Sequence, residues 1–282
     1  MFEKYAIKYK KRTSQNIFQT SPVRMFEIYA KMYQQMNSTH YFSIKELLPQ
    51  LTRGAPVSTR QLVELGVRPR QAASWARSGW LTRLGEETYQ IPGDTLDQFS
   101  CIAFLAEKIP GLHVGGKTAL SWRGVKHNLA VKERILLWGS VQVKLPRWFI
   151  EQFDCRYQVT NIFDSTLPPR TGLSPLPGGN TSVQVSTPER ALLELLSDVG
   201  KSQSLEETKN LVENIRNLRI DVLDELLQHT ARIKVVRMAC EFGDELGLPW
   251  AALAQKHSAR LGGGKRWIAV AKTGETLVLK IK

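Results

Sequence analysis

Seven residues between Ser58 and Leu84 have the side chains that proteins use to read double-stranded DNA. The set comprises Arg60, Arg68, Arg70, Gln71, Ser74, Arg77 and Arg83. Arginine and glutamine make bidentate hydrogen bonds to guanine and adenine edges, and arginine also binds phosphate oxygens. We expect Arg68, Arg70, Gln71, Ser74 and Arg77 to contact the bases of a DNA site, and Arg60 and Arg83 to contact phosphates. The alternative is a structural helical hairpin with an arginine-rich solvated face.

The elements that would position these side chains follow one another in a recognisable order. Ser58 or Thr59 can cap a short helix, and Gly66 ends it. Pro69 suits the first position of a second helix, which the pattern extends to Gly79. Residues 80–84 and 88–91 then read as two strands of a hairpin. This order is typical of a winged helix-turn-helix, whose second helix enters the major groove.

The predicted fold class is α+β, with an N-terminal winged helix-turn-helix and a larger mixed α/β C-terminal domain. Residues 1–40 form a basic N-terminal extension, which is either a disordered arm that adds phosphate contacts or an extension without function. Residues 41–94 form the winged module, whose first helix is expected at residues 44–51. Residues 95–282 form the C-terminal domain, after the boundary at Pro92-Gly93-Asp94.

The composition indicates a globular protein with a polyanionic partner. The 282 residues carry a net charge of +13, and 42% of them are hydrophobic. A basic surface favours nucleic acid, although charge alone does not separate DNA from RNA or from an acidic protein. The sequence has no apolar run of transmembrane length and no signal-peptide core, so no membrane partner is expected. The three scattered cysteines suggest a reduced, cytoplasmic location.

The segment GLHVGGKT, residues 111–118, matches the phosphate-binding pattern G-x-x-x-x-G-K-[ST]. In a true loop of this kind, Lys117 and Thr118 would bind phosphate and magnesium. A helix is predicted before the segment where the motif needs a buried strand, so a glycine-rich entry into a helix at residues 118–123 is favoured. No cofactor is therefore expected.

The remaining pattern predicts alternating strands and helices. Strands are expected at residues 134–138, 141–145, 156–163 and 181–186, with a short helix at 146–153 and a loop at 168–179. Thr187 and Pro188 open a helix rich in leucine. Further helices are expected at 205–218, 220–230, 233–246 and 250–257, and a terminal hairpin at 267–270 and 277–279 after a glycine joint at 262–264.

No catalytic or metal-binding constellation emerges from the sequence. The five histidines are far apart, and no nucleophile elbow or zinc-binding helix motif is present. The charged pair Glu189-Arg190 has two interpretations: it binds a partner or anion, or it fixes the junction between a strand and a helix. The structural interpretation is favoured, because an acid in a first helical turn interacts well with the helix dipole.

Two stretches resemble the AbiEi family of bacterial abortive-infection antitoxins. They are GVRPRQAASWARSGWLTRLGEETYQIP, at residues 66–92, and VQVSTPERALLELL, at residues 183–196. The resemblance spans most of residues 42–230. It implies a cytoplasmic repressor that binds inverted repeats ahead of its own operon, with a C-terminal domain acting opposite a nucleotidyltransferase-like toxin. The chain departs from the family in its extension 1–35 and in the acidic wing tip Glu86-Glu87.

The leading hypothesis is therefore a non-enzymatic antitoxin that represses its own operon. Its expected partners are double-stranded operator DNA and a cognate toxin, met directly or indirectly, with possible oligomerisation on DNA. Two alternatives stay open: a nucleotide-binding enzyme that uses residues 111–118, and an RNA-binding or adaptor protein.

Overall fold

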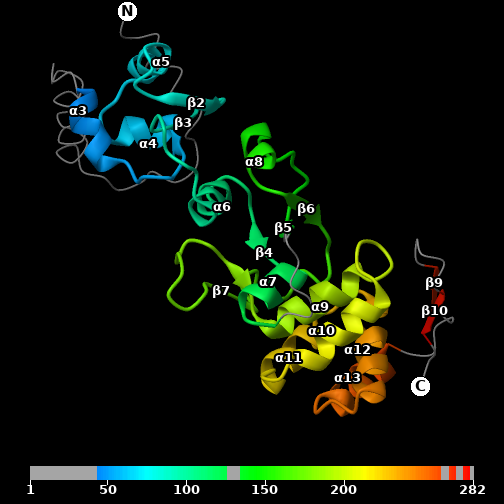
Figure 1. Ribbon diagram of the computed structural model, residues 1–282. Coiled ribbons are helices and arrows are strands. Elements are labelled where there is room, and N and C mark those ends of the chain that lie inside the picture. Colours follow the sequence, from blue (N-terminus) through cyan, green and yellow to red (C-terminus); the bar gives the residue numbers. More distant parts are fainter. Residues whose placement is uncertain (1–42, 126–133, 262–266, 271–275, 280–282) are drawn as a thin grey trace, which may run out of the picture. The chain divides into compact units, whose positions relative to one another are not determined.

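The computed structural model describes residues 43–125, 134–261, 267–270 and 276–279 (Figure 1). Its contacts divide the chain into two compact units, Met1–Leu47 and Leu48–Lys282, and each is described here by itself. The predicted extension at residues 1–40 and the glycine joint at 262–264 lie outside the described residues.

The first unit contributes one short helix to the description, α3 (Ile44–Leu47). The Ser43 backbone N–H donates to a carboxylate oxygen of Glu46 at 2.7 Å, so this acid stabilises the start of the helix. The second unit opens with a 3₁₀ turn, Leu48–Gln50. The predicted single helix over residues 44–51 is therefore wrong in its second half. Pro49 explains the change, because proline lacks an N–H and disfavours a helical residue before it.

The winged module consists of two helices and a three-stranded antiparallel sheet of order β1-β3-β2. Its elements are β1 (Val57–Ser58), α4 (Thr59–Glu64), α5 (Pro69–Arg77), β2 (Thr82–Gly85) and β3 (Thr88–Gln90). The predicted order of helix, turn, helix and hairpin is thus confirmed, and β1 adds a strand that the sequence pattern did not indicate.

Local capping chemistry fixes the turn between α4 and α5. Ser58 and Gln61 form a reciprocal capping box at the start of α4. Gly66 takes the left-handed conformation at φ 89°, and the Val67 N–H then donates to the Leu62 carbonyl at 2.9 Å. Pro69 occupies the start of α5, as predicted. These few residues set the angle at which the second helix is presented.

The C-terminal part is built on a five-stranded mixed sheet of order β6-β5-β4-β8-β7. The strands are β4 (His113–Val114), β5 (Ile135–Gly139), β6 (Cys155–Val159), β7 (Leu173–Ser174) and β8 (Val185–Ser186). Strand β5 runs parallel to β6 and antiparallel to β4, while β4 runs parallel to β8. Three helices lie along this part of the chain: α6 (Gln98–Ala106), α7 (Gly116–Trp122) and α8 (Arg147–Gln152).

Helix α9 (Pro188–Asp198) is central to the hydrophobic core. Its four leucines are all at most 2% exposed: Leu192, Leu193, Leu195 and Leu196. The helix contacts α7 and β8, and also α10 (Leu205–Asn214), α11 (Ile220–Gln228) and α12 (Ile233–Glu245). Helix α13 (Ala251–Arg260) packs on α12, and β9 (Trp267–Val270) pairs with β10 (Thr276–Leu279) as the predicted hairpin.

Several predicted strands are shorter than expected or absent. Residues 141–145 form no strand, because both edges of β5 are already paired with β4 and β6. The predicted strand at 181–186 is reduced to β8, and the predicted loop at 168–179 contains β7, its antiparallel partner. The helix expected over 205–218 ends at Asn214. No helix within the described ranges is long and apolar enough to cross a membrane.

Candidate nucleic-acid interface

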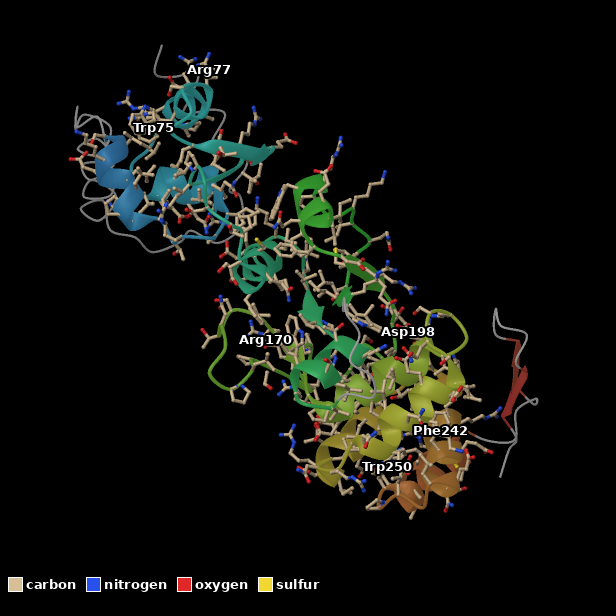
Figure 2. The ribbon with its side chains drawn as sticks, in the orientation of Figure 1. Trp75, Arg77, Arg170, Asp198, Phe242 and Trp250 are labelled. Carbon is tan, nitrogen blue, oxygen red and sulfur yellow. The ribbon has the colours of Figure 1, made fainter. Side chains whose placement is uncertain are left out.

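Helix α5 presents an exposed polar side and a buried side. Arg70, Ser74 and Arg77 are exposed, and their spacing places them on one side of the helix. Ala72 is completely buried and holds the opposite side against the module. Arg77, labelled in Figure 2, donates from Nε to the Ala73 carbonyl at 3.4 Å, a long and weak bond that leaves its guanidinium group in solvent.

The other predicted contact residues lie on the same module. Arg60, Arg68 and Arg83 are exposed, and Gln71 is half-buried. Arg60 pairs with Glu64 one turn along α4, with an Nε–Oε1 distance of 3.0 Å. Exposed pairs of this kind hold side chains only weakly, so the pair does not prevent Arg60 from reaching a phosphate.

Trp80 is a surface feature that the sequence pattern did not indicate. The pattern predicts it at the start of a strand, but its side chain is 52% exposed, between Arg77 and Arg83 in the chain. Its backbone N–H donates to the Trp75 carbonyl at 2.9 Å, in the turn that follows α5. A large exposed aromatic ring between two arginines is an added candidate for contact with a nucleic-acid backbone or a second protein. The Gly-Trp dipeptide immediately after a helix was the available signal.

The wing tip is acidic, as the sequence indicates. Glu86 and Glu87 connect β2 to β3, and Glu87 adopts a left-handed φ of 50°. The Arg83 Nε donates to the Gly85 carbonyl at 3.2 Å, so its guanidinium group lies beside the turn. Because two carboxylates repel phosphate, Arg83 remains the better placed residue of the wing for a phosphate contact.

Internal contacts occupy the polar groups of the segment 111–118. Lys117 forms an ion pair with Glu207, and the Thr118 hydroxyl donates to the Arg134 carbonyl at 3.1 Å. The backbone N–H groups of Gly115 and Gly116 donate to the Leu136 carbonyl and the Glu194 carboxylate. The helix begins at Gly116 and not at Thr118 as predicted. These contacts do not favour the nucleotide-binding alternative, because a phosphate would need the same donors.

A buried ionic cluster surrounds Glu194 on α9. Glu194 accepts hydrogen bonds from His113 Nε2 at 3.0 Å, Arg190 Nε at 2.9 Å, the Gly116 N–H at 2.8 Å and the Ser186 hydroxyl at 2.8 Å. Burial raises the pKa of Glu194, but the His113 and Arg190 charges and the Gly116 bond outweigh it and hold that pKa at about 2. The carboxylate is therefore ionised and fully used.

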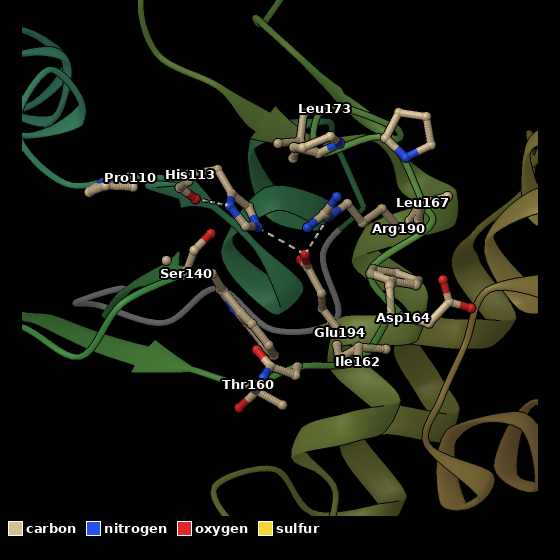
Figure 3. A pocket seen from close by; sticks show the side chains of 17 residues that line it. Pro110, His113, Ser140, Thr160, Ile162, Asp164, Leu167, Leu173, Arg190 and Glu194 are labelled. Atoms are coloured by element: carbon tan, nitrogen blue, oxygen red, sulfur yellow. Dashed lines mark hydrogen bonds and ion pairs between the residues drawn. The ribbon is translucent and has the colours of Figure 1, made fainter. Parts of the chain in front are cut away.

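The same cluster forms one wall of a cavity of about 350 Å³ (Figure 3). His113 Nδ1 lies 2.8 Å from the Gly111 carbonyl, so both ring nitrogens lie within hydrogen-bond distance of an oxygen. Arg190 also donates to the Thr171 carbonyl at 2.8 Å and lies over the Phe163 ring. The charged groups of this cluster are bonded to other parts of the protein, and these bonds hold α9 to β4 and to the segment before β7.

The pair Glu189-Arg190 makes structural contacts at the start of α9, although these reach α11 and the segment before β7 and not β8. Glu189 is fully buried and accepts from the Arg219 backbone at 2.9 Å and from its guanidinium at 3.1 Å. Thr187 takes the predicted cap position, but its side chain makes no capping hydrogen bond. The pair therefore fastens α9 to the start of α11 and to the segment before β7.

The other histidines within the described ranges pair with single carboxylates and not with one another. His229 Nδ1 lies 3.2 Å from Asp164, and His257 Nε2 lies 2.6 Å from Asp224. The part of the chain that the structure describes contains no group of three or more His, Cys, Asp or Glu side chains with metal-site geometry.

Comparison with known proteins gives two family matches that together cover most of the chain. Residues 132–280 match the model of "Transcriptional regulator, AbiEi antitoxin, Type IV TA system", and residues 40–131 match "Transcriptional regulator, AbiEi antitoxin N-terminal domain". A solved structure, the RV2827C protein from Mycobacterium tuberculosis, is similar over 73% of this chain and 76% of that one, with 17% identity and a TM-score of 0.48. No curated protein matches the chain significantly.

Proposed function

Because the chain belongs to the AbiEi family of antitoxin transcriptional regulators, we propose that its winged module binds operator DNA and represses its own operon. The proposed binding surface is the exposed side of α5, with Arg68, Arg70, Gln71, Ser74 and Arg77 contacting the operator and Arg60 and Arg83 contacting phosphates. The observation that carries the proposal is the exposure of all five guanidinium-bearing residues on a helix-turn-helix frame. The proposed operator consists of inverted repeats, and the proposed location is the cytoplasm.

The proposed domain boundaries remain those of the sequence pattern, with the winged module at 41–94 and the antitoxin domain at 95–282. The C-terminal domain is proposed to neutralise a nucleotidyltransferase-like toxin, directly or indirectly, without catalysis of its own. The bonded state of the ionic cluster around Glu194 supports this proposal, since the cluster presents no activated nucleophile or base.

Operator binding by single-arginine variants tests the first part of the proposal. Arg70→Ala and Arg77→Ala should each weaken specific binding by about 1–3 kcal/mol if the side chain reads a base, measured by fluorescence anisotropy with the native promoter. Arg147→Ala is the control, because Arg147 is also an exposed arginine on a helix but lies outside the winged module. Binding that is unchanged in both α5 variants would remove this helix as the reading element.

Co-expression with the toxin separates the two proposed activities. The double variant Arg70→Ala/Arg77→Ala should release repression of a promoter reporter and still protect cells from the toxin. Simultaneous loss of protection would show that neutralisation needs the DNA-binding surface, against the proposed division of labour.

A further inference from the structure

Four basic side chains from three different elements converge beside the C-terminal end of α9. Arg156 comes from β6, Lys201 from the turn after α9, and Arg232 and Lys234 from the start of α12. Lys234 donates from Nζ to the carbonyls of Ser197 and Val199, and the Arg232 guanidinium donates to the Ser197 hydroxyl at 3.3 Å. These bonds place two of the four cations at the last carbonyls of α9.

Arg156 and Lys201 lie beside the same end of α9, as their interactions with Asp198 indicate. Asp198 is labelled in Figure 2. The Lys201 backbone N–H donates to the Asp198 carbonyl at 3.0 Å. Gln158 donates to the Asp198 carboxylate at 2.9 Å, and Arg156 lies two residues before Gln158 on β6, on the same face of the strand. The charges of Arg156 and Lys201 both act on the Asp198 carboxyl.

The cluster has more positive charge than its own carboxylate can offset. Within the described part of the chain, Asp198 is the acid that acts on both lysines. Burial, followed by the neighbouring Lys201 charge, lowers the pKa of Lys234 to about 8. Burial also lowers the pKa of Lys201, and the Arg232 guanidinium is the next cause. Like charges are thus held close enough to destabilise one another.

The structural role of two cations does not account for the whole cluster. Lys234 and Arg232 stabilise the negative end of the α9 dipole, where cations are favourable. Arg156 and Lys201 make no hydrogen bond through their side chains within the described residues. Burial raises the pKa of Asp198, and the charges of Arg156 and Lys201 act against that rise. The first turn of α12 contains no acidic residue, so its positive dipole end adds to the excess.

We propose that Arg156 and Lys201 bind a phosphate group in the C-terminal part of the chain, with the charges of Arg232 and Lys234 beside them. Guanidinium groups bind phosphate oxygens in a bidentate manner and lysines act as compact point charges, so the set matches the chemistry of that ligand. The phosphate comes either from a nucleic-acid backbone or from a free phosphate or nucleotide. The site lies on other elements than the exposed side of α5 and does not depend on operator reading.

Two titrations of the full chain test the site and its source of phosphate. Inorganic pyrophosphate is titrated by calorimetry, and a non-operator DNA duplex is titrated by anisotropy at several salt concentrations. The test variant is Arg156→Ala/Lys201→Ala, which removes no hydrogen bond seen in the fold. The control variant is Arg147→Ala/Arg216→Ala, which removes the same number of exposed arginine or lysine charges elsewhere. Thermal unfolding verifies that both variants are folded.

The expected result is a loss of affinity of roughly tenfold or more in the test variant alone. A loss confined to pyrophosphate identifies a free phosphate or nucleotide as the ligand. A loss confined to DNA, with a salt slope reduced by about 2, identifies the phosphodiester backbone. Equal behaviour of the two variants in both titrations, or no binding of either probe by the wild-type chain, overturns the site. If the α5 variants lose operator binding but still bind pyrophosphate, the two proposals concern different sites.

Discussion

Replacing Glu194 with glutamine isolates the contribution of one buried negative charge to the stability of the C-terminal part. The substitution keeps the shape of the side chain but removes the charge that faces His113 and Arg190. It also places an amide N–H₂ or a neutral oxygen opposite the four groups that now bond to the carboxylate. At least one donor loses its acceptor, and Arg190 loses its counter-ion.

The magnitude follows from the depressed pKa of the carboxyl. The folded state lowers the pKa of Glu194 from 4.5 to about 2, and a tenfold change in proton affinity corresponds to about 1.4 kcal/mol. The ionised carboxylate therefore contributes about 3 kcal/mol at neutral pH, and Glu194→Gln should lower the free energy of unfolding by about that amount. In a chain of this size the midpoint of thermal unfolding falls by roughly 6–12 °C.

The pH dependence gives the sharper test. Because the folded pKa lies below the unfolded pKa, the contribution is complete above about pH 4.5 and is lost as the pH falls towards 2. In urea unfolding, the difference in free energy of unfolding between wild type and Glu194→Gln should be constant near neutral pH and should narrow in acid. Glu206→Gln, at an exposed position of α10, is the control and should change stability by less than about 0.5 kcal/mol. A stability difference that does not depend on pH would refute the reasoning. So would a loss of stability in Glu206→Gln as large as that in Glu194→Gln.

Two further substitutions test the local geometry of the fold. Gly172→Ala should destabilise the chain by about 1–3 kcal/mol more than Gly178→Ala in thermal unfolding. Both glycines have φ near +70°, but an added Cβ meets Arg190 at 2.8 Å only at Gly172, so equal effects would contradict this close approach. Ser58→Ala should cost about 1 kcal/mol through loss of the capping box with Gln61 and should speed amide exchange in α4; unchanged exchange would show that the box does not hold this helix.

The winged module was largely predictable because its signals are local. Ser58 caps α4, Gly66 permits the left-handed turn, and Pro69 opens α5, each through chemistry that a few neighbouring residues decide. The exposure of Arg70 and Arg77 followed from helical spacing alone. Which of these side chains reaches a base depends on the DNA, and stays a prediction.

The C-terminal sheet was less predictable because its strands are short and its pairings are distant. Strands β4, β7 and β8 have two residues each, too few for an alternating pattern, and β4 pairs with β8 across about seventy residues of chain. Residues 141–145 alternate like a strand, but no free sheet edge remains beside β5. Sequence spacing does not reveal which edges are already occupied.

Glu194 was not singled out from the sequence, although a signal existed. It stands among four leucines of α9, where a solvated carboxylate would be unusual, and it follows Arg190 by one helical turn. An acid enclosed by apolar residues on both sides needs a buried partner. His113, which is distant in sequence, supplies one, and only the folded chain brings the two together.

The enclosure of α9 divides the C-terminal part into a portion that tolerates little change and a portion that is free to vary. Substitutions on α9 affect the sheet and four surrounding helices at once, since all of them contact it. Substitutions on the outward sides of α10, α11 and α13 do not disturb the sheet and the other helices in this way. Sequence variation that leaves the fold intact is therefore expected on these outer helices and not on α9.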